Sequence, residues 1–186
     1  MEHGAGTLIG MEQASRAMDR SAIEQAIREI HLDCFGWALA CCRHDRDEAE
    51  DVLQASYLKA LEGTATFNGS SSVKTWMFGV VRRTAWERRR SSLLRRFLRR
   101  DVPEDPPPST PTPESVASDR EAHARLRALL AQLSPRQRDL LHLVYYQEMT
   151  IEDASEVLGI SLGTARTHYE RGKQRLRALL NGRNLA

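Results

Sequence analysis

Apolar residues recur at three- and four-residue steps through most of the chain, which is the spacing of amphipathic helices. The first such stripe predicts a helix from Ser21 to about Cys42. Its inward positions are Ile23, Ile27, Ile30, Cys34, Trp37 and Cys41. A second helix is predicted from about Asp47 to Leu61, and its acidic opening suits the positive end of a helix dipole. A third begins near Val73 and carries Trp76, Met77, Val80 and Val81 inward.

The same spacing returns in the last third of the chain. Leu126, Leu129, Leu130 and Leu133 predict one amphipathic helix. Ser134 and Pro135 then form an N-cap and first-turn pair for the next helix. We expect the core face of that helix to consist of Leu140, Leu141, Leu143, Val144 and Tyr145.

The segment from Thr150 to Leu180 is typical of two helices joined by a tight corner. Ile151, Ala154, Val157 and Leu158 share one helix face. Gly159 follows, where a helix end favours a residue that tolerates positive φ, and Ser161 is a good N-cap for a second helix. Because that second helix is polar and basic, the pattern indicates a DNA-binding helix-turn-helix. The alternative is an ordinary αα-hairpin in a helical bundle.

A proline-rich, acidic stretch over residues 101–118 separates the two groups of helices. Six prolines and four carboxylates leave it little to bury, so we expect an extended linker. The predicted fold is therefore all-α, with two small helical domains at 21–100 and 119–186. Residues 1–20 contain three glycines and little periodicity, and are expected to form a flexible arm.

Composition narrows the class of protein. The chain has 186 residues, 28% of them charged and 6% aromatic, with a formal charge of +2. No apolar run reaches the roughly 18 residues that a membrane span needs, and residues 1–20 lack the apolar core of a signal peptide. Three cysteines are an odd count without secretory features, which argues against a disulfide framework. We expect a cytoplasmic protein without membrane insertion.

The modest net charge hides a dense basic run between residues 74 and 100. It holds Lys74, Arg82, Arg83, Arg88, Arg89, Arg90, Arg95, Arg96, Arg99 and Arg100. The single acid there is Glu87, and aromatic residues including Trp86 and Phe97 are interleaved. Rings beside cations suit unpaired bases and their phosphates, whereas the simpler alternative is a solvated helix face.

Three stretches in this order resemble the extracytoplasmic-function group of bacterial sigma-70-class sigma factors. DEAEDVLQASYLKAL at 47–61 is similar to the helix that binds core RNA polymerase. FNGSSSVKTWMFGVVRRTAWERRR at 67–90 resembles the promoter −10 segment, which belongs to sigma region 2. LSPRQRDLLHLVYYQEMTIEDASEVLGISLGTARTHYERGKQRLRALL at 133–180 resembles the −35-binding domain, sigma region 4.

The resemblance implies roles for particular residues. The core-polymerase-binding positions are Asp51, Gln54, Leu58 and Lys59. The positions for single-stranded −10 DNA are Asn68, Ser70, Ser71, Ser72, Lys74, Trp76, Arg82 and Arg83. Small polar groups in that loop suit a flipped base, although the apolar stripe makes core packing the favoured role of Trp76. The positions for duplex −35 DNA are Ser161, Gly163, Thr164, Arg166, Thr167, His168 and Arg171. Arg83 and His168 depart from the family's usual asparagine and arginine, so base preferences do not transfer.

The implied function is a sigma factor that directs core polymerase to promoters and helps to melt the −10 region. Its implied partners are core RNA polymerase, promoter DNA and an anti-sigma factor. No catalytic constellation, cofactor motif or metal site is recognisable, so we expect no enzyme. His31, His44 and the three cysteines could form a redox or metal sensor, but buried packing is the favoured role of Cys34 and Cys41. Two further alternatives are a dimeric, operator-binding helix-turn-helix regulator and a helical interaction module without DNA contact.

Overall fold

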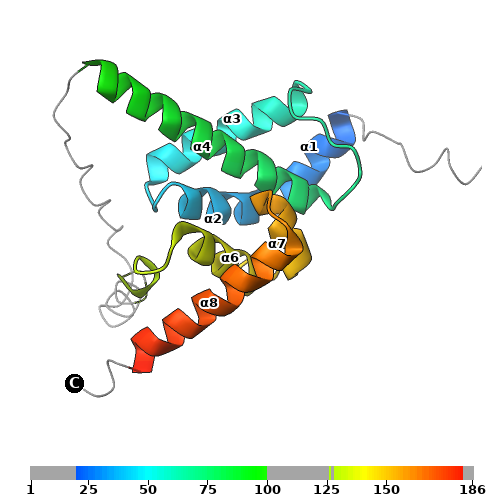
Figure 1. Ribbon diagram of the computed structural model, residues 1–186. Coiled ribbons are helices and arrows are strands. Elements are labelled where there is room, and N and C mark those ends of the chain that lie inside the picture. Colours follow the sequence, from blue (N-terminus) through cyan, green and yellow to red (C-terminus); the bar gives the residue numbers. More distant parts are fainter. Residues whose placement is uncertain (1–19, 100–125, 127, 182–186) are drawn as a thin grey trace, which may run out of the picture.

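The computed structural model describes residues 20–99, 126 and 128–181, and all regular elements among them are helices (Figure 1). The predicted linker at 101–118 and the predicted arm up to residue 19 lie outside the described residues. The first group of helices is α1 (Arg20–Glu29), α2 (His31–Cys41), α3 (Arg46–Leu61) and α4 (Val73–Arg99). The second group is α6 (Pro135–Tyr145), α7 (Ile151–Leu158) and α8 (Leu162–Asn181).

The prediction of one helix from Ser21 to Cys42 is wrong, because the helix is interrupted at Ile30. Ile30 has φ −99° and ψ 11°, outside regular helical values, and α2 begins at the next residue. Neither glycine nor proline marks the break, so the sequence pattern gives no signal of it. The predicted apolar stripe still faces inward before and after the break, with Ile23 and Ile27 of α1 and Cys34 of α2 buried.

Trp37 lies at the centre of the first bundle and is fully buried. Its indole Nε1–H donates a hydrogen bond to the backbone oxygen of Phe78, at 3.0 Å, and the two rings stack with centroids 6.0 Å apart. A buried indole needs such a partner, because an unpaired N–H inside a core costs free energy. The contact fixes α2 against the N-terminal part of α4.

The ends of α3 follow from local capping. The side chain of Asp45 accepts a hydrogen bond from the backbone N–H of Glu48, so this helix begins one residue before the predicted Asp47. Asp47 and Glu48 occupy its first turn, as the dipole favours. The long α4 crosses α2 and α3, and its C-terminal end extends beyond the bundle (Figure 1).

In the second group, Ser134 and Gln137 form a complete capping box at the start of α6. Leu140, Leu141 and Leu143 are buried, as expected. The prediction that Tyr145 belongs to the core face is wrong, since its side chain is 62% exposed. It stacks on Tyr169 of α8 instead, with ring centroids 6.0 Å apart.

The predicted corner between α7 and α8 is present. Thr150 caps α7 by accepting from the N–H of Asp153, and Gly159 ends it in the left-handed region with φ 59° and ψ 43°. The hydroxyl of Ser161 then accepts from the N–H of Thr164 at 3.2 Å, which starts α8. The helix-turn-helix is therefore built as the sequence predicts.

The two groups of helices pack together: α7 lies against α4, and α6 lies against α2. Buried side chains from both groups form one continuous hydrophobic cluster. His142 of α6 contacts Trp37 with ring centroids 5.4 Å apart. The division into two domains stays a prediction, and any such domains meet along an extensive contact.

Candidate nucleic-acid interface

Three of the four predicted polymerase-binding residues share the solvent side of α3. Asp51, Gln54 and Leu58 are spaced by three and four positions and are all exposed, with Leu58 50% accessible. Lys59 turns away from them, because its Nζ lies 2.5 Å from a carboxylate oxygen of Glu87 and 3.2 Å from the hydroxyl of Thr84. The structure thus brings three of the four together, and an exposed leucine at their edge is a ready apolar contact.

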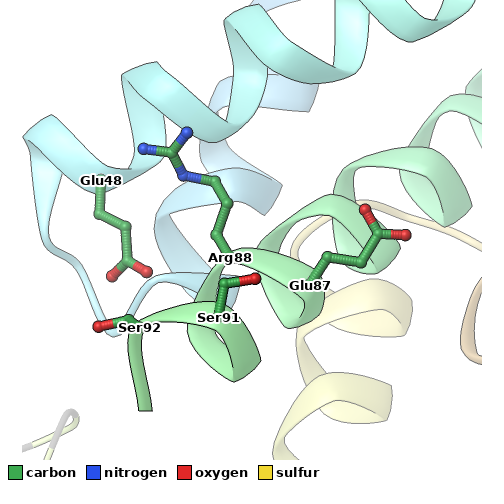
Figure 2. A pocket seen from close by; sticks show the side chains of 5 residues that line it. All are labelled: Glu48, Glu87, Arg88, Ser91 and Ser92. Carbon is green, nitrogen blue, oxygen red and sulfur yellow. The ribbon is translucent and has the colours of Figure 1, made fainter. Parts of the chain in front are cut away.

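Ion pairs connect α3 to α4 beside this exposed face. Arg88 reaches from α4 to the carboxylate of Asp51. Figure 2 shows Arg88 beside Glu48, Glu87, Ser91 and Ser92, which line a hollow of ≈ 490 Å³ between the two helices. The hollow is shallow and hydrophilic. The ion pair between Arg88 and Asp51 lies beside it and orients the Asp51 carboxylate.

The loop before α4 is organised around Asn68. Its side-chain oxygen accepts hydrogen bonds from the backbone N–H of Ser70, at 3.1 Å, and from the Ser70 hydroxyl, at 2.7 Å. Gly69 between them has φ 75°, which glycine adopts without strain. Ser72 has a structural role as well, since its hydroxyl accepts from the N–H of Thr75 and caps α4.

This loop and α4 enclose a second pocket, of ≈ 300 Å³. Five of the predicted −10 residues line it: Asn68, Ser70, Ser71, Trp76 and Arg83. Trp76 is half-buried and rests on Phe67, with ring centroids 5.2 Å apart, so it packs and also faces the pocket. Because small polar groups surround one aromatic wall, the pocket suits the edge and the face of a nucleobase.

Sequence reasoning missed three important residues of this pocket: Thr75, Gly79 and Glu156. Gly79 lies one turn beyond Trp76, and nothing stands within 4 Å of where its Cβ would be. The three-residue spacing from Trp76 could have identified Gly79. Glu156 belongs to α7, so no local pattern could have placed it there.

The predicted basic residues on α4 separate into free and engaged groups. Arg83 is exposed beside the pocket. Lys74 pairs with Asp33 at 2.8 Å and donates to the backbone oxygen of Gln147 at 3.2 Å. Arg82 lies 3.8 Å from the carboxylate of Asp139 on α6.

Burial shapes the charges at this contact. It lowers the pKa of the Arg82 guanidinium, with the nearby charge of Arg136 acting in the same direction. Burial also raises the pKa of the Asp139 carboxyl, against the opposing effect of Arg82. Arg82 and Arg136 both donate to the backbone oxygen of Leu158, at 3.4 and 3.2 Å. That oxygen ends α7, where the helix dipole attracts cations.

The second helix of the corner presents an exposed polar face. Gly163, Thr164, Arg166, Thr167 and Arg171 are exposed, as is the capping Ser161, whereas His168 is half-buried. Thr167 donates to the backbone oxygen of Gly163 at 2.9 Å, and Arg166 pairs with Glu152 at 3.1 Å. Except for the more covered His168, the predicted −35 residues therefore lie on one accessible surface, as major-groove contact requires.

The cysteines are packed rather than poised for chemistry. Burial raises the pKa of the Cys34 and Cys42 thiols to about 12, so few thiolates form near neutral pH. All three cysteines are free.

Over the described part of the chain, no group of three or more His, Cys, Asp or Glu side chains could hold a metal ion. Among those same residues, no helix is long and apolar enough to cross a membrane.

Comparison with protein families finds a match for each of the two groups of helices. Residues 27–100 match the family model for sigma-70 region 2, and residues 123–176 match that for sigma-70 region 4.

Individual proteins agree with these matches. The chain is 28% identical to RNA polymerase sigma factor YlaC of Bacillus subtilis, over 85% of this chain and 91% of that protein. It is 30% identical to the extracytoplasmic-function sigma factor SigX of the same organism, over 72% of this chain and 71% of that protein. The fold is similar to that of the sigma factor RpoE of Bartonella quintana, solved in complex with the anti-sigma factor NepR. The TM-score is 0.68 at 22% identity, over 85% of this chain and 96% of the other.

Proposed function

Because the chain belongs to the extracytoplasmic-function group of sigma-70 RNA polymerase sigma factors, we propose roles for its individual residues in promoter recognition. As a sigma factor it directs core RNA polymerase to specific promoters and helps to melt the −10 region. We place this work in the cytoplasm, where core polymerase acts. The sigma factor contributes binding, and the polymerase supplies the chemistry.

The exposed face of α8 binds duplex DNA at the −35 element. A polar helix of this kind fills the major groove, where Thr164 and Arg166 reach base edges from its first turns. Arg171 lies further along and contacts phosphate. Since phosphate contacts release counterions, this binding weakens as the salt concentration rises.

The pocket between the serine loop and α4 receives an unpaired base of the −10 element, and this pocket is the observation that carries the proposal. Asn68 holds the loop in shape, Ser70 and Ser71 present hydroxyls to the base edge, and Trp76 supplies an aromatic wall. Arg83 stands at the pocket for the phosphate backbone. Because only a melted strand can offer the base, binding favours the open promoter.

Asp51, Gln54 and Leu58 form the contact with core polymerase, and Lys59 supports α4 through Glu87. The assembled polymerase holds both DNA-binding surfaces on one promoter. Two modest contacts then act as one strong contact through their effective concentration.

We further propose that an anti-sigma factor restrains this protein. The structurally similar sigma factor of Bartonella quintana was solved with such a partner. The exposed polymerase-binding face around Leu58 is one surface that this partner would cover, because covering it prevents assembly with core polymerase.

Permanganate footprinting of reconstituted polymerase on a promoter of this sigma factor tests the pocket. Asn68→Ala removes both hydrogen bonds to Ser70, so we expect about tenfold weaker −10 opening, corresponding to roughly 1.4 kcal/mol. Duplex −35 binding is expected to stay unchanged. Gln25→Ala on α1 removes a comparable exposed amide that does not line the pocket, and serves as control. Normal −10 opening by Asn68→Ala would contradict the assignment.

A further inference from the structure

Part of the surface proposed to meet −10 DNA is covered in this structure, although Arg83 and most of the serine loop stay exposed. Thr75 is 2% exposed and donates to the carboxylate of Asp153 on α7, at 3.3 Å. Arg82 faces Asp139 of α6 and the backbone oxygen of Leu158. Glu156 of α7 lines the base pocket. The second domain thus covers this face with carboxylates and carbonyl oxygens.

These groups resemble a nucleic-acid backbone in their chemistry. Asp153, Asp139 and the backbone oxygen of Leu158 offer anionic or carbonyl oxygens to Thr75 and Arg82, donors that could otherwise contact phosphate. The end of α7 adds the negative pole of its dipole beside Arg82. By contrast, the −35 face of α8 points outward and stays accessible.

From this asymmetry we propose that the region 4 domain acts as an internal inhibitor of the −10 face. In the free chain, α6 and α7 occupy the part of the α4 surface around Thr75 and Arg82, and they leave the −35 surface available. The domains must separate before a melted strand can bind. The inference rests on the proposed function, because that assigns the covered face to −10 DNA.

Two substitutions separate the domains by different physical means. Asp139→Asn removes the carboxylate that faces Arg82 and leaves the guanidinium without its ion partner in the closed form. Gly36→Leu acts as a wedge, because even a Cβ at residue 36 would lie 3.3 Å from the side chain of Gln147 and 3.5 Å from that of Tyr146. Leucine is a better helix former than glycine, so α2 itself is not weakened.

Each variant has a matched control. Glu170→Gln removes one negative charge from α8, where Glu170 is exposed and pairs only locally with Lys173. Gln25→Leu adds a leucine to the exposed side of α1. These controls separate opening from a simple change in charge or hydrophobicity.

The test uses the full chain without polymerase. Small-angle X-ray scattering measures compactness, and fluorescence anisotropy measures binding to a short, labelled single-stranded DNA of mixed sequence. Affinity scales with the open fraction, so we expect both variants to expand and to bind the single strand about tenfold more tightly. Binding of both variants to duplex DNA should remain as in the unmodified chain, and both controls should keep its compactness and its single-strand affinity.

Failure of either folded variant to expand, or expansion without tighter single-strand binding, would overturn the inference. Circular dichroism verifies helical content, and if Asp139→Asn does not fold, the wedge variant alone decides. The proposed function is judged separately, by whether the unmodified chain supports transcription with core polymerase. Transcription without domain opening in the variants would refute the internal inhibitor and leave the sigma function standing.

Discussion

Replacing glycine by alanine should have opposite effects at two positions of this chain. Gly159 ends α7 with φ 59°, and Gly79 lies inside α4 without a positive φ. At both positions, nothing lies within 4 Å of where a Cβ would be. The added methyl group therefore meets no neighbouring side chain at either position. The change in stability depends only on the backbone conformation that alanine and glycine prefer.

The magnitudes follow from that preference. An L-residue in the left-handed region costs roughly 1–2 kcal/mol, offset in part by the lower entropy of the unfolded chain, so Gly159→Ala should destabilise by about 1 kcal/mol. In a helix interior the same change removes the conformational cost of glycine, so Gly79→Ala should stabilise by about 0.5–1 kcal/mol. Gly159→Asn should cost less than Gly159→Ala, because asparagine tolerates this conformation.

Urea unfolding followed by circular dichroism provides the assay. With a denaturant slope of about 2 kcal/mol/M, the midpoint should fall by roughly 0.5 M for Gly159→Ala and rise by roughly 0.3 M for Gly79→Ala. Equal stability of the alanine and glycine proteins at residue 159, or a loss at residue 79, would refute the reasoning. Gly79→Ala should also weaken −10 opening, because its methyl group enters the base pocket.

Three other perturbations test separate parts of the structure. Trp37→Phe loses the hydrogen bond to the Phe78 backbone oxygen and should destabilise by about 1–3 kcal/mol in urea, whereas an unchanged midpoint would argue against that contact. Burial lowers the pKa of His142 to about 4, below the usual value of 6.5 that applies in the unfolded chain. Between these two pH values the unfolded chain binds a proton at this residue and the folded chain does not. Stability should therefore fall by up to about 3 kcal/mol as the pH drops from 6.5 towards 4, and His142→Phe should remove that loss. Glu152→Gln frees Arg166 and should tighten duplex −35 binding a few-fold in anisotropy titrations, and weaker binding would contradict the proposed contact.

Local signals explain the parts of the fold that the sequence predicts well. Capping by Ser134 and Ser161 and the glycine at 159 mark helix ends through chemistry within a few residues. These elements appear as predicted. The break at Ile30 does not follow from any such signal, because the apolar stripe runs on through it as it would in one helix. Tyr145 continues the apolar face of α6 in the sequence, yet it packs on α8 at the surface because its hydroxyl finds a partner there.

The candidate site also depends on contacts that no local sequence signal encodes. Spacing along α4 and the resemblance to known sigma factors pointed to the pocket residues, and the structure brings most of them together. The contacts of Lys74 and Arg82 with the second domain depend on residues far away in the sequence. No periodicity encodes which surfaces of two helical bundles meet. The covered −10 face could therefore be found only in three dimensions.

Run-off transcription with purified core polymerase on fragments of the source genome tests the central claim most directly. With this chain present, we predict new discrete transcripts whose start sites share a −35 and a −10 element. The same transcripts should be lost when the polymerase-binding face is disrupted by Leu58→Asp. No new transcript with core polymerase, together with salt-sensitive binding of the free protein to one duplex site, would contradict the account and indicate an operator-binding regulator.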